Sequence, residues 1–266
     1  DRRQGTVVSE WKTYFPESLP IAALGAASFK LGADYEQALG KMEVVFERNT
    51  GAMQAWASNS LETMNLSKLS ATQIASDFGA LFKGMGMSID KTSEWSMTLT
   101  ERVMDLSNFY DTTVDETVNA LNAIVSGQTQ PLRKFGINMT EATLQEYAFA
   151  NGVKKKVSEM TEAEKVQLRY NFVMDRTAIA VGTTARESDS ATAQLNKLKE
   201  ISMELGISFA EVIIPAILPF IEVLNTVLKW LAGLDEGAKK FIGTIGFLLF
   251  AVGPVLSMIS RVTGLM

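Results

Sequence analysis

The chain has 266 residues, of which 47% are hydrophobic and 21% charged, a balance that permits a buried core and excludes a disordered chain. Its net charge of −5 provides no overall positive field for a polyphosphate backbone, so neither tight nor sequence-specific nucleic-acid binding is expected. The sequence contains no His and no Cys, which removes the commonest general base, thiolate nucleophiles, disulfides and the usual zinc ligands. We therefore expect no enzyme activity, no cofactor and no metal site.

Helical periodicity dominates the sequence from its first strong pattern onward. Apolar residues recur at steps of three and four, whereas the alternation typical of strands is weak, which predicts an all-α fold without a sheet. The first two stripes read Tyr35, Leu39, Met42 and Phe46, then Met53, Trp56, Ser60, Leu61 and Met64. Stripes of this kind favour contacts within a core over contacts with a cofactor.

Three capping patterns predict helix starts farther along the chain. Ser70 is followed by Gln73, Thr113 by Glu116 and Thr161 by Glu164, each at the spacing of a capping box. Between the first two, residues from about Asp90 to Tyr110 carry Trp95, Leu99, Val103, Leu106 and Phe109 in helical register. Glycines at 84, 86 and 127 are expected to end helices.

The segment from Ser126 to Gly136 is the least generic part of the sequence. It reads Ser-Gly-Gln-Thr-Gln-Pro-Leu-Arg-Lys-Phe-Gly, with turn-forming residues at both ends and a basic-aromatic middle. A short helix from about Glu141 to Ala150 and a break at Asn151-Gly152 are expected next. The run Lys154 to Lys156 that follows suits a solvated turn, with a nucleic-acid or membrane surface as the alternative.

The C-terminal third becomes strongly apolar. Ala191, Leu195, Leu198, Ile201 and Leu205 form a near-heptad stripe that suits either a packed helix or a coiled coil. From Ile207 to Ala232 the apolar run is interrupted by charges and by Pro215 and Pro219, so we expect a pair of interfacial or bundled helices.

An uncharged run from Phe241 to Ile259 follows a polar hinge. At about 1.5 Å per residue it is ~28 Å long, close to the ~30 Å hydrocarbon thickness of a bilayer. It is predicted to be able to span a membrane, with a buried helix in an assembly as the alternative. Its candidate lipid-facing residues are Phe241, Ile245, Leu248, Leu249, Val252, Leu256 and Ile259.

The predicted organisation has three parts. Residues 1–29 form a connecting segment, residues 30–206 a multi-helix core, and residues 207–266 a hydrophobic, membrane-competent helical hairpin. Because the chain begins with Asp1 and its first residues lack the layout of a signal peptide, we interpret it as a piece of a longer protein.

Several sequence blocks occur together in a recognisable order. Gly127, Pro131, Leu132, Arg133 and Gly136 belong to the first, which lies between Phe109 and Leu144. Then come Met-Thr-Glu-Ala-Glu-Lys-Val-Gln-Leu-Arg-Tyr at 160–170, Ser-Asp-Ser-Ala-Thr-Ala-Gln-Leu at 188–195, and Ile-Pro at 214–215; Ala-Asp-Tyr-Glu-Gln-Ala at 33–38 precedes them all. Across residues 30–230 the chain resembles the core region of phage tail tape measure proteins. The long helical ruler segments typical of that family are missing.

The resemblance implies a structural protein of the phage tail lumen or tip. Such a protein sets tail length, scaffolds the tail tube and is released to help DNA cross the host membrane. Its implied partners are further copies of itself in a symmetric, threefold association, the tail tube protein, the tail tip or distal tail proteins, the host membrane and DNA in transit.

Two other function classes remain open from the sequence. An α-helical pore-forming protein would use the apolar region beyond Ile207, and vesicle leakage by the isolated chain would favour it. A tail-associated lytic factor would need an acid and a nucleophile, for which Glu159, Glu162 and Glu164 are candidates. The last two also suit the start of a helix, as a dipole-facing residue and a capping-box partner.

Overall fold

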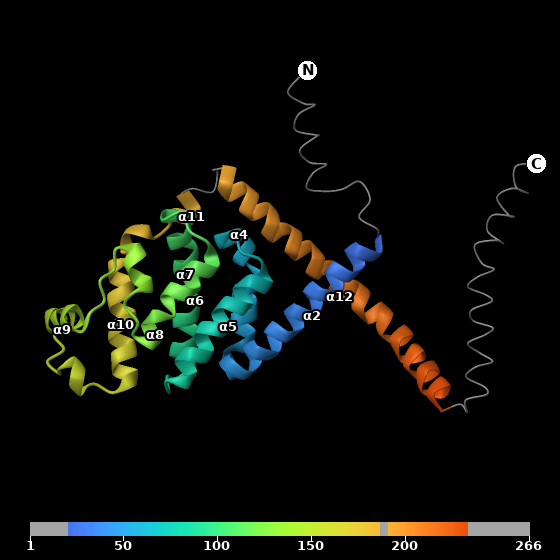
Figure 1. Cartoon of the computed structure of the whole chain (residues 1–266), viewed down its shortest axis with the longest axis horizontal. Helices are drawn as coiled ribbons and strands as arrows, with labels where there is room; N and C mark the ends of the chain where they lie inside the picture. Colours follow the sequence, from blue (N-terminus) through green and yellow to red (C-terminus); the bar gives the residue numbers. More distant parts are fainter. Residues whose placement is uncertain (1–20, 187–190, 234–266) are drawn as a thin grey trace, which may run out of the picture. The chain divides into compact units, whose positions relative to one another are not determined.

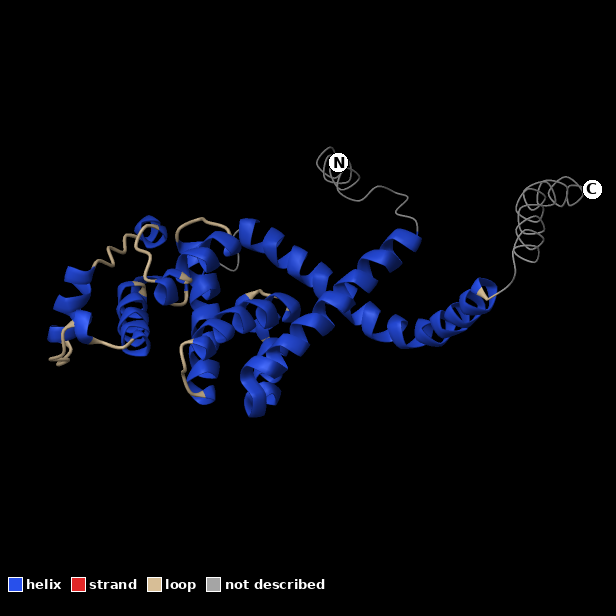
Figure 2. Cartoon of the chain, turned by 60° about the horizontal axis from the view of Figure 1, so that its bottom comes forward, coloured by secondary structure: helices blue, strands red, loops and turns tan. Residues whose placement is uncertain are grey.

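The computed structural model describes residues 21–186 and 191–233, and every regular element in these ranges is helical, which confirms the all-α prediction for that part of the chain (Figure 2). The 3-10 helices are η1 (Glu47–Asn49), η2 (Pro131–Phe135), η3 (Val157–Glu159) and η4 (Ala178–Ala180). The α-helices are α2 (Ile21–Phe46), α3 (Thr50–Ser58), α4 (Ser60–Met64), α5 (Lys68–Gly84), α6 (Ile89–Phe109), α7 (Val114–Leu121), α8 (Ala123–Ser126), α9 (Glu141–Ala150), α10 (Glu162–Arg176), α11 (Thr183–Arg186) and α12 (Ala191–Ala232).

The chain divides into two compact units, and the boundary falls between Glu211 and Val212 within α12. In the first unit α5 and α6 lie side by side at the centre; α2 packs on α5, and α7, α10 and α11 are arranged around α6 (Figure 1). The main core contains Phe78 and Phe82 of α5 together with Trp95, Leu99 and Val103 of α6, as their spacing predicts.

Aromatic rings and a pair of polar side chains tie α10 and α11 to α6. The indole of Trp95 stacks on the ring of Tyr170, with centroids 3.8 Å apart. Two turns along α6, Arg102 donates to the Thr177 hydroxyl over 2.9 Å, beyond the end of α10. One turn farther, the Asp105 carboxylate accepts from the backbone N–H of Gly182 and Thr184, before and within α11. These contacts use helix-end groups that would otherwise lack partners.

Two of the three predicted helix starts are confirmed and one is corrected. The Thr113 and Thr161 hydroxyls accept from the N–H groups of Glu116 and Glu164, and Thr161 with Glu164 forms a complete capping box. The prediction at Ser70 was wrong, because α5 begins at Lys68 and its N-cap is Ser67. Ser70 is the third residue of that helix.

The expected pair of helices between Ile207 and Ala232 was also wrong, since α12 continues through both prolines as one helix. A proline removes one helical hydrogen bond and bends a helix without having to end it. Among the described helices none has the length and apolarity needed to cross a membrane. The run Phe241–Ile259, and with it all seven predicted lipid-facing residues, lies outside the described residues.

Candidate functional site

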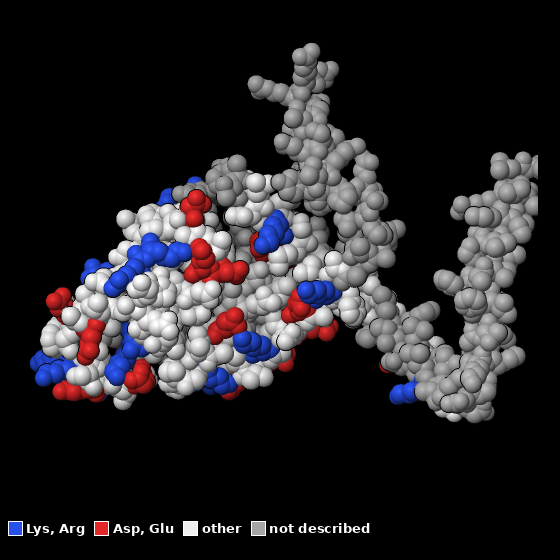
Figure 3. Space-filling view, in the orientation of Figure 1, with Lys and Arg blue, Asp and Glu red and all other residues white. Residues whose placement is uncertain are grey.

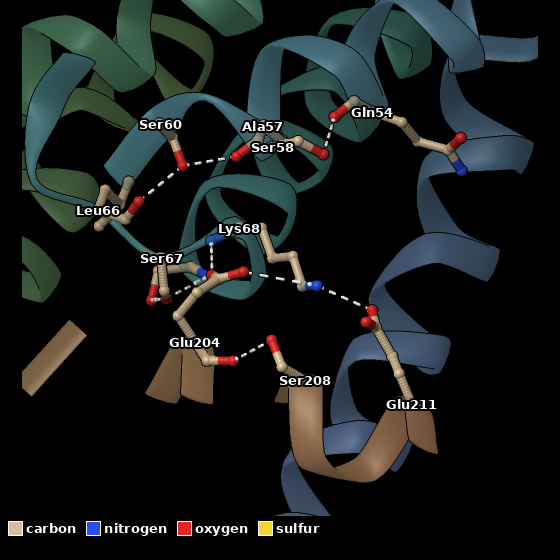
Figure 4. Close-up of polar contacts among 11 residues, drawn as sticks. Gln54, Ala57, Ser58, Ser60, Leu66, Ser67, Lys68, Glu204, Ser208 and Glu211 are labelled. Atoms are coloured by element: carbon tan, nitrogen blue, oxygen red, sulfur yellow. Dashed lines mark hydrogen bonds and ion pairs between the residues drawn. The ribbon is translucent and has the colours of Figure 1, made fainter. Parts of the chain in front are cut away.

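The first turns of α12 are attached to the N-terminus of α5 by two carboxylates. The backbone N–H of Ser67 donates to Glu200 Oε2 over 2.9 Å. The backbone N–H of Lys68 donates to Glu204 Oε2 over 3.0 Å (Figure 4). The Ser70 hydroxyl also donates to Glu200, over 3.1 Å. The first N–H groups of a helix lack partners in the helix and carry partial positive charge, so a carboxylate there is stabilised by hydrogen bonds and by the helix dipole. Two residues one turn apart on α12 thereby cap α5.

The side chain of Lys68 adds a second polar contact between the same elements. Its ammonium group lies 2.8 Å from Glu211 Oε1 and 3.4 Å from Glu204 Oε1 (Figure 4). It also lies 5.0 Å from the centroid of the Tyr35 ring on α2. Burial alone would lower the pKa of Lys68, but the hydrogen bond to Glu211 and the two negative charges raise it above its ordinary value. The lysine therefore stays charged and joins α2, α5 and α12 through one group.

Apolar contact in this junction is confined to a small patch. Ile207 is fully buried against Ala38 and Leu69, with Leu31 and Met203 at the edge. The helices approach closely where α12 crosses α2: a Cβ on Gly206 would stand 2.5 Å from Leu31 Cδ1. The attachment thus combines a few close apolar contacts with charged groups, and we name it the α12 junction.

The opposite face of α12 carries the predicted near-heptad stripe and is not packed on this chain's core. Leu195 is 68% exposed and Leu205 58%, and Phe209 beyond them is 62% exposed. Large apolar side chains in a row on one exposed helix face are typical of a contact surface. Against the described residues of the first unit, these three side chains are therefore largely unpacked.

The family-motif block begins with a left-handed turn after α8. Gly127 has φ of +72°, a conformation that favours glycine, and it forms the C-cap of the helix. The Arg169 guanidinium on α10 lies over this turn and donates to the Val125 carbonyl over 3.2 Å. A Cβ on Gly127 would stand 2.8 Å from Arg169 Nη2. The first glycine of the block is thus required by both its backbone angle and a close neighbour.

The middle of the block folds as η2 and anchors in the core. Pro131 occupies its first turn, where the missing N–H costs nothing, while Leu132 and Phe135 are buried. Gly136, with φ of +70°, closes the element: its N–H donates to the Arg133 carbonyl and that of Ile137 to the Leu132 carbonyl, the Schellman pattern. The Tyr110 hydroxyl donates to the Phe135 carbonyl over 2.9 Å, which ties the block to the end of α6.

Arg133 differs from the apolar members of the block. Its side chain is exposed, and within the described residues it makes no hydrogen bond or ion pair through its guanidinium. Its neighbour Lys134 is already paired with Glu116, 2.9 Å away. On the face of the molecule in Figure 3, basic and acidic side chains are interspersed. Among the described residues, Arg133 is therefore the cation of the block whose guanidinium is exposed and has no partner.

Two of the three candidate catalytic carboxylates, those of Glu162 and Glu164, have structural partners. The Glu164 carboxylate accepts from the Thr161 N–H over 2.7 Å and from Lys155 over 2.6 Å. These hydrogen bonds, that of Lys155 first, lower the pKa of Glu164 to about 2. The pKa of Glu162 is lowered by its hydrogen bond to Lys165. A general acid needs a raised pKa, so neither group is suited to that role at neutral pH.

A hollow of about 590 Å³ borders the α12 junction in the first unit. Its lining is mixed, with Gln73, Asn108, Asp111 and Asn196 among the polar residues and Met104 and Met203 among the apolar ones. Glu200 also lines it but is used in capping α5. Among the described residues, no group of three or more acidic side chains is placed to hold a metal ion.

The sequence did not predict that the carboxylates of Glu200 and Glu204 would cap α5 and attach α12 to it. Their i, i+4 spacing on the face opposite Leu198 and Leu205 was visible, but it is typical of any solvated helix face. Their partners lie 133 and 136 residues away in the chain.

Comparison with known proteins adds no further constraint: no family model, no curated protein and no solved structure matches this chain.

Proposed function

We propose that this chain is the core region of a phage tail tape measure protein, a structural protein without enzyme activity. In this role it lies inside the tail, helps set tail length, scaffolds the tail tube and leaves ahead of the DNA. The proposal is supported first by the ordered sequence blocks across residues 30–230. The observation that carries it is the Gly127–Gly136 block, in which Leu132 and Phe135 are buried while Arg133 is exposed and has no partner among the described residues.

Within this short block, Leu132 would serve the folding of the chain and Arg133 would serve contact with another protein. Leu132 is fully buried, so it acts through the fold. The surroundings of Arg133 indicate no role for it in the fold. Its planar guanidinium is suited to pair with a carboxylate on a neighbouring protein. The tail tube protein, or a tail tip or distal tail protein, is the partner that the proposed location supplies.

The two roles predict opposite outcomes for adjacent substitutions. Arg133→Ala should leave the free energy of unfolding within about 0.5 kcal/mol of wild type, as surface changes usually do, but reduce the yield of complete tails. Leu132→Ala should cost about 2–5 kcal/mol of stability because it leaves a cavity in the core. Urea unfolding of the chain and electron-microscope counts of tails measure the two effects. If particles with Arg133→Ala have normal tail yield and tail length, Arg133 does not contact a tail protein and no longer supports the proposed function.

The proposal also includes association with further copies and with the host membrane. Copies would associate symmetrically, with threefold symmetry, in the virion tail. After release, residues 207–266 would form a hydrophobic hairpin, and the uncharged run Phe241–Ile259 within it would enter the host membrane while DNA passes without sequence-specific binding. The support is the bilayer-like length of the run and the cations that flank it, Lys239 and Lys240 on one side and Arg261 on the other.

Leu249→Arg tests the membrane role separately from assembly. An arginine near the centre of a spanning helix costs about 2.5–3.5 kcal/mol on insertion scales. Tail yield and tail length should be nearly normal, whereas genome delivery should fall. Equal delivery by mutant and wild-type particles would show that the run has no membrane role. Efficient leakage of lipid vesicles by the isolated wild-type chain would instead favour a pore-forming protein.

A further inference from the structure

The exposed apolar residues of α12 follow one heptad register. In the first unit they are Leu195, Leu198, Leu205 and Phe209, with exposed fractions of 68%, 39%, 58% and 62%. With Leu195 at position a, they occupy a, d, d and a, and the exposed Ser202 takes the remaining a position. A side chain three or four residues from the next lies on the same face of the helix, so these five residues form a narrow seam.

The same register continues in the sequence beyond the boundary of the first unit. Among the α12 side chains that the structure describes in the second unit, the exposed large apolar ones are Val212, Val223 and Trp230, at 74%, 61% and 60% exposure. Counted from Leu195, they fall at positions d, a and a. The other a and d positions there are Ala216, Pro219 and Thr226, so large apolar residues follow the 3.5-residue period closely only from Leu195 to Val212. Such a period is the pattern of a helix that supercoils with another helix, since an isolated straight helix has 3.6 residues per turn.

The junction in the first unit leaves this seam accessible. Glu200 and Ile207, which face the core of the chain, occupy position f, and Glu204 occupies position c. These positions lie on the side of a heptad opposite a and d. The chain therefore uses the back of α12 to attach the helix to its own core, and the described residues of the first unit leave the seam largely exposed.

We propose that this seam, defined by Leu195, Leu198, Ser202, Leu205 and Phe209 and continued by Val212, Val223 and Trp230, binds the same face of α12 in a second copy of the chain. A fully buried side chain of this size removes roughly 60–120 Å² from water, and these are about 40–75% exposed. At their average exposure of about 60%, the seven apolar residues offer roughly 250–500 Å² per copy. Two copies would bury roughly 500–1,000 Å² through these side chains, and the upper end of this range meets the lower limit for a specific interface.

A second copy fits the seam better than a lipid surface does. A helix that lies on a membrane presents a broad apolar face flanked by Lys and Arg, and its polar face remains in water. Here the exposed apolar face is a narrow stripe, and the polar face of the first turns is bound to α5. This inference deepens the self-association proposed above and does not depend on a location in a tail.

Charged side chains introduced into the seam test the proposal, because they should weaken self-association without disturbing the fold of a single copy. The double variant Leu205→Glu, Phe209→Glu places two carboxylates at exposed positions, so the chain should keep its helical circular dichroism spectrum. Its self-association, measured by analytical ultracentrifugation of the full chain, should weaken at least about tenfold because like charges would meet in the interface. Val44→Glu is the matched control, because Val44 is 71% exposed on α2 and lies outside the seam. It should associate as wild type does.

A single introduced thiol then locates the contact, since the natural sequence has no cysteine. The thiol of Ser202→Cys should react with a bulky maleimide at least about tenfold more slowly in the associated protein than after dilution, and the thiol of Ser58→Cys on α3 should react equally fast in both. A chain that is monomeric at all concentrations would overturn both this seam and the self-association. If the chain associates but the Ser202→Cys thiol stays fully reactive and the double glutamate variant associates normally, the seam alone is overturned.

Discussion

Two glycines of the motif block have nearly the same backbone angle but different surroundings. Gly127 has φ of +72° and Gly136 of +70°, so alanine at either position incurs the left-handed cost of roughly 1–2 kcal/mol. At Gly136 a Cβ would meet nothing within 4 Å, whereas at Gly127 it would meet the Arg169 guanidinium. The guanidinium would have to move and give up its bond to the Val125 carbonyl.

We therefore predict that Gly127→Ala destabilises the chain by about 1 kcal/mol more than Gly136→Ala, the typical value of one hydrogen bond. Urea unfolding monitored by circular dichroism measures both. The double variant Gly127→Ala, Arg169→Ala should lose most of the excess, because the neighbour that the new methyl group meets is gone. Equal losses for the two single variants would show that Arg169 moves aside freely.

At the scale of elements, the attachment of α12 to α5 depends on two carboxylates. Glu200→Gln with Glu204→Gln keeps hydrogen-bond acceptors but removes both charges from the N-terminus of α5. The loss should be about 1–2 kcal/mol, since a charge at a partly buried helix end is worth up to about 2 kcal/mol. Hydrogen exchange should become faster at the Ser67 and Lys68 amides and in residues 194–211, with little change in α6.

Glu222→Gln is the control for that pair. It lies on the same helix, is exposed, and pairs with no basic side chain among the described residues. It should leave exchange at Ser67 and Lys68 as in wild type. If the double glutamine variant also leaves those amides unchanged, the apolar patch around Ile207 holds the junction alone.

The sequence predicted those helix ends whose determinants are local. Thr113 and Thr161 were assigned correctly because the capping residue and its partner lie within four residues. At the start of α5 two serines stand three residues apart, and local sequence favoured Ser70 because of Gln73. The structure selects Ser67, where Glu200 and Glu204 supply acceptors from 133 and 136 residues away. Such a long-range cap has no local sequence pattern.

At the Gly127–Gly136 block, the sequence predicted the turns but did not predict which side chains are buried. Its glycines and Pro131 predicted turns, and turns are present at both ends. The segment between them is a 3-10 helix with Leu132 and Phe135 in the core. Which apolar residues of a short block point inward depends on the helices around it, here α6 and α7. The sequence therefore located the block but did not distinguish buried Leu132 from exposed Arg133.

At the scale of the whole molecule, we expect low pH to destabilise the fold. A change of pH between about 5 and 8 should leave its stability nearly unchanged. The pKa values of Glu47, Asp90, Glu116 and Glu162 are lowered by hydrogen bonds to basic or amide side chains, and that of Glu164 is lowered from 4.5 to about 2. A lowered folded-state pKa contributes stability that is present above the unfolded pKa and lost as pH falls through the folded one. The sequence has no His or Cys to titrate between about pH 5 and 8.

The melting temperature should therefore be nearly constant from about pH 5 to 8 and fall between about pH 4.5 and 2. Glu164→Gln should reduce the fall, because glutamine keeps an acceptor for the Thr161 amide and does not titrate. Differential scanning calorimetry across this range measures both chains. A steep change in melting temperature between about pH 5 and 8 would mean that groups other than these carboxylates control the pH dependence.

We propose that this chain is a structural component of a phage tail. The most direct test is a cryo-electron microscopy map of purified tails from the particle that encodes it, compared with tails whose copy carries a small folded tag in the exposed turn at Lys154. We expect helical density within the tube lumen or tip, on the tail axis, with extra density in the tagged particles. Tails that lack the chain, or carry it only on their outer surface, would contradict the claim.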